Sequence, residues 1–375
     1  MAEDIPHPPN HPESPLSPTS GSEPASQPSP EPAFDLTVIV PARNEQDCLA
    51  DCLRSLTSQS DSVFKLGVDW ELIVVDDQST DRTHDIALSF PGVTVLPSQP
   101  LETGWTGKNN ACFTGALHAR GQWMLFTDAD TVHEPGNLHR ALHEAEKHKV
   151  GMLSYSPGQL VSGLWQRALM PLVFCELALA FPAAKVSDPE SRIAAANGQF
   201  LLISREAYDL IGGHEWVKGD VLEDVKLAFR AKKRRIGLRF RYADDALSTR
   251  MYRTTSAMIE GWTKNLAELF GNCIALAAWR TLDILLLIGL PILAARYWSA
   301  GLPHLPWFPA GVILMLVWLR NLWRYYARVA KSNFGFLNCL LSPLALPLFV
   351  VILLRSWYQV EVRHEVSWKG RTYKA

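Results

Sequence analysis

The sequence lacks the Cys-x-x-Cys pairs of many metal and redox proteins, and it has no excess of charge of one sign. Lysine and arginine total 36, aspartate and glutamate total 38, and the formal net charge is −2. With so little net charge, no overall field attracts a nucleic acid, and we expect no nucleic-acid partner. The first residues also lack the basic start and apolar run of a signal peptide, so we expect no secretory leader.

The cysteines are few and scattered. Cys48 and Cys52 lie one helical turn apart, but no histidine or further cysteine at ligand spacing accompanies them, which makes a zinc site improbable. Several of the other four lie in apolar segments. We therefore expect reduced, buried thiols in a domain that faces the cytosol.

Large apolar side chains are nearly absent from residues 1–33, which consist mainly of proline, serine and glutamate. Such a segment buries too little surface to offset the entropy lost on ordering, so we predict a disordered tail.

Residues 34–275 alternate between short β-branched runs and segments with helical spacing of apolar residues. This alternation predicts an α/β domain with a mostly parallel sheet and helices on both faces. The predicted strands are 36–40, 70–75, 93–96 and 123–127, and the predicted helices between them are 45–56, 80–90 and 109–119.

Acidic residues follow two of these strands. Asp76 and Asp77 end the second, and Asp128 and Asp130 follow the fourth. Because parallel sheets bind ligands outside the carboxyl ends of their strands, we expect these side chains to share one edge. Two carboxylates one residue apart can bind a hard cation that bridges a diphosphate, although solvated acidic pairs at loop starts are common.

Two further turns belong to the same edge. Pro41 to Glu45 follows the first strand, and a carboxylate there or at Asp76 or Asp77 can accept hydrogen bonds from a base or ribose. Ser79 to Asp81 also suits the start of a helix, and both interpretations can hold together.

Three other polar segments are candidates for chemistry. Lys108, in a glycine-rich loop, can place a positive charge near a diphosphate, although the loop has neither Walker A nor dinucleotide spacing and could be a plain turn. Glu223 and Asp224 open a helix, where the macrodipole favours acids; one of them could instead be a general base. Asn197 and Gln199 lie in a polar turn and are possible acceptor contacts.

Residues 276–358 are predicted to be a membrane region. Three mostly apolar stretches approach spanning length and carry tryptophan and tyrosine at their edges; they are 282–298, 307–323 and 336–357. Arginines and a lysine lie between the second and third, which favours a multi-pass protein of the cell (inner) membrane with a cytoplasmic catalytic domain. The alternative is a buried, soluble helical domain.

The third stretch conflicts with the positive-inside rule, because a span there would export the basic tail, 359–375. Pro343 and Pro347 interrupt it, and we expect a re-entrant hairpin that returns the tail to the cytosol. Residues 160–182, broken by Pro171 and Pro182, are expected to form a platform on the bilayer surface rather than a span.

Five motifs taken in order carry a resemblance to a known family. They are Val-Ile-Val-Pro-Ala-Arg-Asn-Glu, Val-Val-Asp-Asp-Gln-Ser-Thr-Asp, Gly-Trp-Thr-Gly-Lys, Asp-Ala-Asp and Glu-Asp-Val. Together they resemble glycosyltransferase family 2, of the GT-A fold, over residues 36 to about 270. The Gly-Trp-x-Gly-Lys loop, the Asn-Gly-Gln-Phe turn and the terminal Trp368-Lys-Gly-Arg-Thr-Tyr373 look like the branch of hopanoid-associated and carotenoid glycosyltransferases.

This resemblance implies a nucleotide-sugar donor, in most cases uridine-linked, bound by Pro41, Glu45 and Asp76 or Asp77. It implies manganese or magnesium at Asp128 and Asp130. It further implies that Asp224 is the general base of an inverting transfer, with Glu223 beside it. Residues that could stabilise the leaving diphosphate or contact the acceptor are Lys108, Arg250, Arg253 and Trp262.

One departure from the family bears on the product. Processive synthases carry Gln-x-x-Arg-Trp after the base, whereas here Arg250-Met-Tyr-Arg253 precedes Trp262 by several residues. We therefore expect single transfer to a lipid acceptor such as a hopanoid, carotenoid or other isoprenoid. Two alternatives stay open: a polyprenyl-phosphate sugar transferase, favoured by basic residues after Asp224, and a non-catalytic membrane scaffold with a nucleotide-binding fold.

Overall fold

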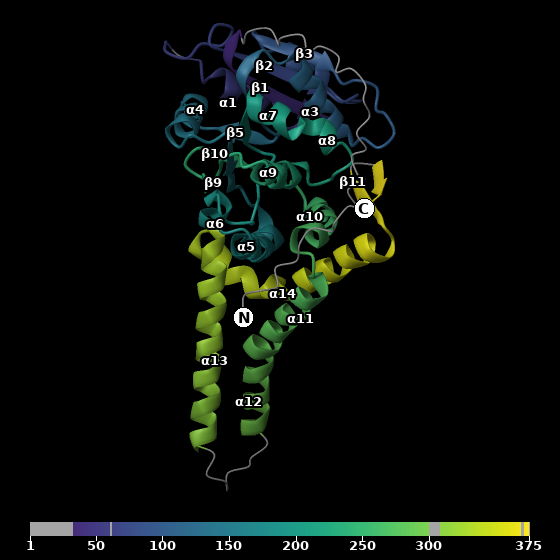
Figure 1. Cartoon of the computed structure of the whole chain (residues 1–375). Helices are drawn as coiled ribbons and strands as arrows, with labels where there is room; N and C mark the ends of the chain where they lie inside the picture. Colours follow the sequence, from purple (N-terminus) through teal and green to yellow (C-terminus); the bar gives the residue numbers. More distant parts are fainter. Residues whose placement is uncertain (1–32, 61, 300–307, 369–370, 375) are drawn as a thin grey trace, which may run out of the picture. The chain divides into compact units, whose positions relative to one another are not determined.

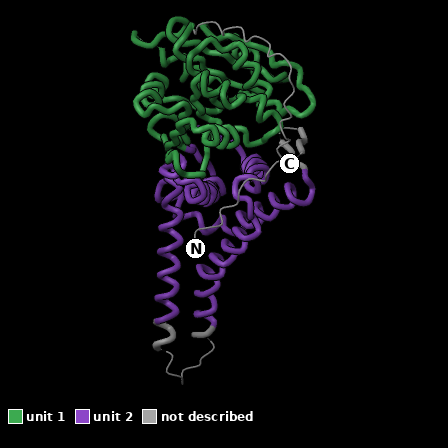
Figure 2. Tube along the Cα trace, viewed as in Figure 1, with its two compact units in different colours: residues 1–158, 187–248 green, residues 159–186, 249–375 purple. Residues whose placement is uncertain are grey.

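The computed structural model describes residues 33–60, 62–299, 308–368 and 371–374. The predicted disordered tail, apart from Ala33, lies outside this part of the chain. Two compact units are present: unit 1 contains residues 1–158 and 187–248, and unit 2 contains residues 159–186 and 249–375 (Figure 2). Residues 159–186 and 249–275 thus pack with the C-terminal helices, while the predicted domain boundaries themselves remain predictions.

Unit 1 is built on a seven-stranded sheet of order β3-β2-β1-β4-β8-β6-β9. The first four strands along the chain are parallel, and only β8 runs antiparallel to its neighbours β4 and β6. The α/β class and the four predicted strands are therefore confirmed. The strand bounds are β1 Phe34–Ala42, β2 Trp70–Asp76, β3 Val93–Pro97, β4 Gly121–Phe126, β6 Met152–Ser156, β8 Leu201–Ser204 and β9 Leu238–Tyr242.

Helices on this sheet form where apolar side chains recur every three or four residues. In α1, Leu49, Cys52, Leu53 and Leu56 are fully buried, and each such leucine contributes roughly 1.5–3 kcal/mol. The helices of unit 1 are α1 Leu49–Thr57, α2 Thr83–Leu88, α3 Gly107–His118, α4 Asn137–Lys147, α7 Arg205–Ile211, α8 Gly213–Trp216 and α9 Glu223–Lys233. Short strands β5 Thr131–His133, β7 Gly158–Gln159 and β10 Leu247–Thr249 form a second sheet.

Helix α3 approaches strand β1 closely because it carries a glycine at the contact. A Cβ atom added to Gly115 would lie 2.4 Å from Cγ2 of Ile39, which no side chain tolerates. This close contact fixes the height of α3 over the sheet. It thereby sets where the first turn of α3, which contains Lys108, lies along the strand ends.

Unit 2 is helical. Its elements are α5 Gly163–Ala180, α6 Ala183–Ser187, α10 Thr255–Phe270, α11 Cys273–Ile284, η1 Leu285–Gly289, α12 Leu290–Ser299, α13 Phe308–Val329, η2 Ala330–Ser332, α14 Phe336–Trp357, η3 Tyr358–Val362 and a hairpin of β11 Glu365–Trp368 with β12 Arg371–Lys374. Helices α12 and α13 contact each other and run side by side, whereas α14 packs on α5, α10 and α11 and crosses the view (Figure 1).

Three helices are long and apolar enough to cross a membrane: Gly163–Ser187, Cys273–Arg296 and Phe336–Val362. Helix α13, which contains residues 308–323 of the predicted stretch 307–323, is not among them, since its arginines lower its mean hydropathy; residue 307 lies outside the described part of the chain. The first of the three was expected to be broken at Pro171, yet α5 continues through that residue.

The expected hairpin within residues 336–357 is wrong. Helix α14 is continuous, with Pro343 and Pro347 inside it. Each proline removes one backbone hydrogen bond, but the buried face of α14, which includes Leu346 and Phe349, packs against the neighbouring helices and holds the helix together.

Four charged side chains, buried or partly buried, form ion pairs between helices of unit 2. Arg280 Nη1 lies 3.3 Å from Glu176 Oε1 and 2.8 Å from Asp283 Oδ2. Arg328 Nη2 lies 2.6 Å from the same Asp283 oxygen. The two positive and two negative charges give the group a net charge of zero. Removing any one member would leave a charge of the group without a full partner.

Candidate active site

The carboxyl ends of β1, β2 and β4 meet at one edge of the sheet in unit 1. Strand β1 pairs with β2 on one side and β4 on the other, both parallel to it, so the chain reverses its winding direction at β1. Open α/β sheets bind ligands at such a switch point. Asp76, Asp77, Asp128 and Asp130 all follow these strands, as predicted.

Two turns at this edge are joined to each other. Asn44 Oδ1 accepts from the Thr80 amide at 2.9 Å, and the Asn44 amide donates to Ser79 Oγ at 3.0 Å. The Glu45 amide donates to Thr83 Oγ1 at 2.8 Å. Pro41 and Glu45 are consequently held beside the turn that follows β2, which the sequence predicted only as two separate motifs.

The two acids after β2 are already engaged. Asp76 Oδ1 accepts from the Ser79 amide at 3.0 Å, and His84 Nδ1 lies 3.2 Å from Asp76 Oδ2. Asp77 is buried, with Arg43 Nη1 3.5 Å from its Oδ2. The expected capping role falls to Asp81, whose Oδ1 accepts from the Thr83 amide at 3.0 Å.

Lys108 lies between two carboxylates from distant parts of the chain. Its Nζ is 2.9 Å from Asp128 Oδ1 and 2.8 Å from Glu223 Oε1. Burial lowers the pKa of Lys108, but the carboxylates of Asp128 and Glu223 raise it more, so the pKa lies well above its usual value. The lysine is therefore a permanent positive charge at this edge of the sheet.

The loop before Lys108 is fastened to the loop before α9. Thr106 caps α3 by accepting from the Asn109 amide at 3.2 Å, and the Thr106 amide donates to Lys218 O at 2.7 Å. Asn109 Nδ2 donates to Val217 O at 2.6 Å and to Asp220 O at 2.9 Å. This connection was not predicted from the sequence. The available signal was an asparagine in the first turn of a predicted helix.

Asp224 is held by two backbone amides. Its Oδ2 accepts from Gly198 at 2.7 Å and its Oδ1 accepts from Val225 at 2.8 Å. Burial raises the Asp224 pKa, the Glu223 charge raises it further, and Lys108 and the two amides lower it, which leaves it at about 7. A carboxyl group that titrates near neutral pH suits proton transfer.

The turn that contains Gly198 fits around these charges. A Cβ at Gly198 would lie 2.8 Å from Lys108 Nζ and 3.3 Å from Glu223 Oε1, so a larger residue here would displace the ends of these side chains. Asn197 Oδ1 accepts from the Gln199 amide at 2.9 Å and shapes the turn. Their predicted contacts with an acceptor stay predictions.

Asp128 and Asp130 are hard oxygen donors on either side of a buried alanine. Both act on the Cys52 thiol, whose pKa is raised by burial first and then by the charges of Asp130 and Asp128. Among the described residues, no group of three or more histidines, cysteines or acids could hold a metal. Two carboxylates fit a divalent cation such as Mg²⁺ that completes its shell with phosphate oxygens and water.

Beneath the acids lies a chain of neutral polar groups that sequence reasoning did not find. Thr127 Oγ1 donates to Gln199 O at 2.8 Å and lies 3.1 Å from His133 Nε2. Asn137 Nδ2 is 3.2 Å from His133 Nδ1. Burial lowers the pKa of His133 to about 3, so the ring is neutral and braces β4 just before Asp128.

Other predicted site residues belong to unit 2. Arg250 and Arg253 are exposed, and Trp262 is buried with its Nε1 3.3 Å from Met170 Sδ. Their part in diphosphate or acceptor binding stays a prediction. In unit 1, Lys232, one of the basic residues after Asp224, donates to the carbonyls of Asp188, Ser191 and Ile193.

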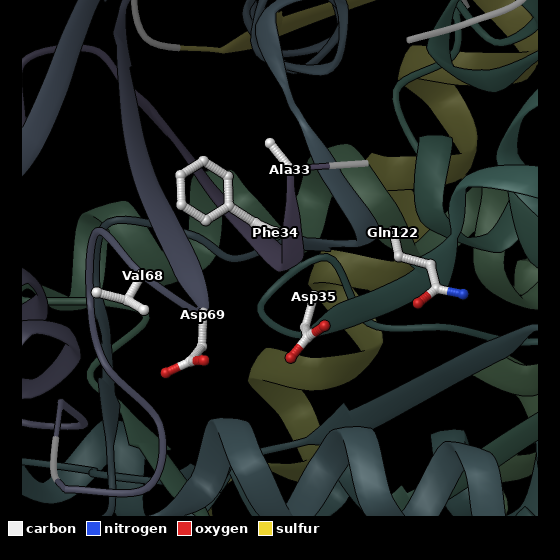
Figure 3. A pocket seen from close by; sticks show the side chains of 6 residues that line it. All are labelled: Ala33, Phe34, Asp35, Val68, Asp69 and Gln122. Carbon is white, nitrogen blue, oxygen red and sulfur yellow. The ribbon is translucent and has the colours of Figure 1, made fainter. Parts of the chain in front are cut away.

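One shallow pocket lies at the opposite edge of the sheet, by the amino ends of β1 and β4 (Figure 3). Its lining includes the carboxylates of Asp35 and Asp69 and the amide of Gln122. None of the predicted site residues lines it. The chemistry-bearing side chains are therefore gathered at the other, carboxyl edge.

Comparison with known proteins agrees with this geometry. The chain is 26% identical over 351 residues to 4,4'-diaponeurosporenoate glycosyltransferase of Staphylococcus aureus (strain MRSA252), covering 90% of this chain and 88% of that protein. The protein of the same name from strain USA300 is 26% identical over 349 residues.

A solved structure shares the fold. The mannosyltransferase from Pyrobaculum calidifontis, in complex with GDP-Man and Mn²⁺, superimposes with a TM-score of 0.51 at 19% identity, covering 89% of this chain and 90% of that one. The predicted GT-A fold is thereby confirmed. Residues 37–208 match the sequence model of glycosyl transferase family 2. The chain thus has the GT-A fold, and its residues 37–208 are similar to glycosyl transferase family 2.

Proposed function

We propose that the protein is a membrane-bound, inverting glycosyltransferase that moves one sugar from a nucleotide donor, in the first instance UDP-linked, to a lipid acceptor. The observation that carries the proposal is a cluster of charges at the switch point of the sheet: Lys108 pairs with both Asp128 and Glu223. Asp224, next to Glu223 in the chain, is held by the Gly198 amide and feels the charges of Glu223 and Lys108. A buried carboxyl group whose pKa is raised to about 7 by burial and by a neighbouring charge is typical of a catalytic site.

In this mechanism the donor nucleoside lies against Pro41, Glu45 and the turn with Asp76 and Asp77. Asp128 and Asp130 would hold Mn²⁺ or Mg²⁺, which would neutralise the diphosphate as it leaves. Supporting this, the P. calidifontis mannosyltransferase of the same fold is in complex with GDP-Man and Mn²⁺.

Asp224 is the general base. In its ionised form it takes the proton from the acceptor hydroxyl while the acceptor oxygen attacks the anomeric carbon, and the bond to the diphosphate breaks. A single carboxylate on the side opposite the leaving group gives inversion at that carbon. Glu223 acts one step away, by holding Lys108 and by raising the Asp224 pKa.

A lipid acceptor accounts for the apolar surface of unit 2. Large hydrophobic side chains are exposed along α11, α13 and α14, among them Trp279, Leu316, Trp323 and Leu337. Exposed apolar area on this scale marks a lipid-facing surface. The S. aureus relative is named for a carotenoid-type acceptor, 4,4'-diaponeurosporenoate, which supports an isoprenoid lipid here.

The proposed topology keeps unit 1 and the basic tail in the cytosol. Helix pair α12–α13 enters the bilayer, and α14 lies along its surface with Leu337, Leu340 and Leu344 toward the lipid. Arg324 and Lys331, at the end of α13, are exposed and lie on the cytosolic side, in line with the positive-inside rule.

The test is product formation by full-length protein in detergent. A panel of UDP- and GDP-linked sugars is supplied with native lipid extract, in Mn²⁺ or in EDTA, and extracted lipids are analysed by mass spectrometry. We expect a monoglycosylated lipid in Mn²⁺ only, with inverted anomeric configuration by NMR. Donor binding without any product, across the whole panel, would favour the scaffold alternative instead.

A further inference from the structure

Lys108 binds a carboxylate, that of Asp128, which a divalent cation at the proposed metal site would also bind. Its ammonium nitrogen is 2.9 Å from the Asp128 oxygen Oδ1 and is held on its other side by Glu223 Oε1 at 2.8 Å. Asp128 and Asp130 are the residues that fit such a cation. A cation bound to Asp128 would therefore lie next to a fixed positive charge, in competition for the same carboxylate.

The surroundings keep Lys108 in this place. Residues on both sides of it are fastened to the loop before α9 through Thr106 and Asn109. Gly198 lies close on a third side, where an added Cβ would be 2.8 Å from the ammonium nitrogen. These contacts hold the backbone of Lys108 in place, whereas its side chain is 38% exposed and can swing toward the edge of the sheet.

We propose that Lys108 excludes free metal from the Asp128–Asp130 site and releases Asp128 only when a nucleotide diphosphate arrives. The inference rests on the proposed function, in which a diphosphate and a metal meet at this edge. The diphosphate supplies the negative charge that both Lys108 and the metal need. Metal and donor are then bound together, and an empty enzyme does not carry metal at this site.

The physical basis is repulsion between a single and a double positive charge a few ångströms apart. Solvent that reaches the partly exposed Lys108 side chain weakens this repulsion without removing it. We therefore expect neutralising Lys108 to raise affinity for free Mn²⁺ at least about tenfold. With nucleotide present the same change should weaken Mn²⁺ binding, because the diphosphate has lost its ammonium partner.

The experiment measures Mn²⁺ binding by electron paramagnetic resonance, with full-length protein and with or without UDP. Wild type should bind Mn²⁺ tightly only with UDP. Lys108→Met should bind free Mn²⁺ at least about tenfold more tightly than wild type and lose most of the effect of UDP. Lys108→Arg keeps the charge and should behave as wild type without UDP. Lys226→Met, which removes a nearby lysine outside the site, is the matched control.

Each result decides between distinct conclusions. Free-Mn²⁺ affinity in Lys108→Met equal to or below that of wild type, with the UDP effect in wild type intact, would overturn the exclusion by Lys108 and leave the proposed function standing. Absence of Mn²⁺ binding by wild type in UDP would instead contradict the donor site. Should Lys108→Met not fold, Lys108→Gln removes the charge while its amide still donates to both carboxylates, and the same outcomes apply.

Discussion

At the scale of single residues, the account depends on how the charge of Asp224 is balanced. Burial and Glu223 raise its pKa, and Lys108 lowers it, to about 7. As the proposed general base, Asp224 would act only when ionised. Glu223 and Lys108, which shift this pKa in opposite directions, would have no covalent part in the proposed reaction.

The first prediction is a pH profile. Because Asp224 must be deprotonated to accept a proton, kcat/KM should be constant above pH 7 and fall about tenfold per pH unit below it. Lys108→Met removes the charge that lowers this pKa, so the acidic limb should move to higher pH. An unchanged limb in that variant would show that another group controls the profile.

The second prediction concerns stability and follows from the same raised pKa. A carboxyl whose folded pKa exceeds its unfolded pKa favours the folded state less as pH rises from about 4 to about 7. Asp224→Asn cannot ionise. In EDTA, the melting temperature of Asp224→Asn minus that of wild type should therefore increase as the pH rises from 5 to 8. Parallel melting curves for the two proteins across that range would argue against a strained, ionised Asp224.

The position of Asp128 and Asp130 at the carboxyl edge of the sheet could be predicted from the sequence, because they directly follow an apolar run typical of a strand. The roles of Glu223 and Asp224 were implied only by the family resemblance, since acids in a first helical turn are common, and these roles stay predictions. The Lys108 bridge could not be, since it needs residues 108, 128 and 223 to be brought together by the fold. The chain Thr127–His133–Asn137 carries no sequence signal beyond ordinary polar residues.

At the scale of elements, the tie between α3 and the loop before α9 positions the site. Asn109 donates to three backbone carbonyls, those of Val217, Lys218 and Asp220. It thus links the turn that carries Lys108 to the helix that carries Asp224. The Thr106 amide and the Lys108–Glu223 pair connect the same two segments, and Asn109 adds three hydrogen bonds to them.

The third prediction tests this tie with two neighbouring asparagines. Asn109→Ala should lower kcat and cost about 1–3 kcal/mol of unfolding free energy, because buried carbonyls lose their donor. Asn110→Ala removes a single bond from Nδ2 to Gln99 O, 2.6 Å long, and should reduce stability while kcat stays near that of wild type. Equal kcat in the two variants would mean that the tie does not position the base.

Elements were predictable where the pattern was local. The runs that became β1 and β2 are rich in β-branched and other apolar residues, and α1 has clear helical spacing. Strand β8 has only four residues and runs antiparallel, so neither length nor alternation identified it. The two prolines of α14 led to the wrong prediction of a hairpin, because packing against neighbouring helices outweighs the two lost hydrogen bonds.

At the scale of the whole molecule, the chain combines an α/β unit that carries the charges of the candidate site with a helical unit that exposes apolar side chains. The second unit gathers residues 159–186 with 249–375, which are separated in sequence by residues 187–248, the segment that contains β8, α7, α8, α9, β9 and β10. Local sequence patterns cannot predict that two such distant segments pack together. It makes α5 part of the proposed membrane-binding unit.

The fourth prediction tests which unit meets the lipid. Leu316→Lys, in the middle of α13, should greatly reduce flotation of the protein with liposomes, because a lysine within a bilayer costs about 2.5–3.5 kcal/mol. Leu88→Lys in α2 is the control, since Leu88 is 62% exposed and Leu316 is 57% exposed. Loss of flotation in the control, with Leu316→Lys unaffected, would place the membrane surface on unit 1.

The central claim is that Asp224 is the base of a transfer at the edge formed by β1 and β4. It is tested most directly by comparing UDP affinity and glycolipid formation in wild type and Asp224→Asn under identical conditions. We predict unchanged UDP affinity in Mn²⁺ and a loss of product formation of roughly 10²-fold or more, since the donor site stays intact while proton transfer is lost. Product formation near the wild-type rate in a correctly folded Asp224→Asn would contradict the account.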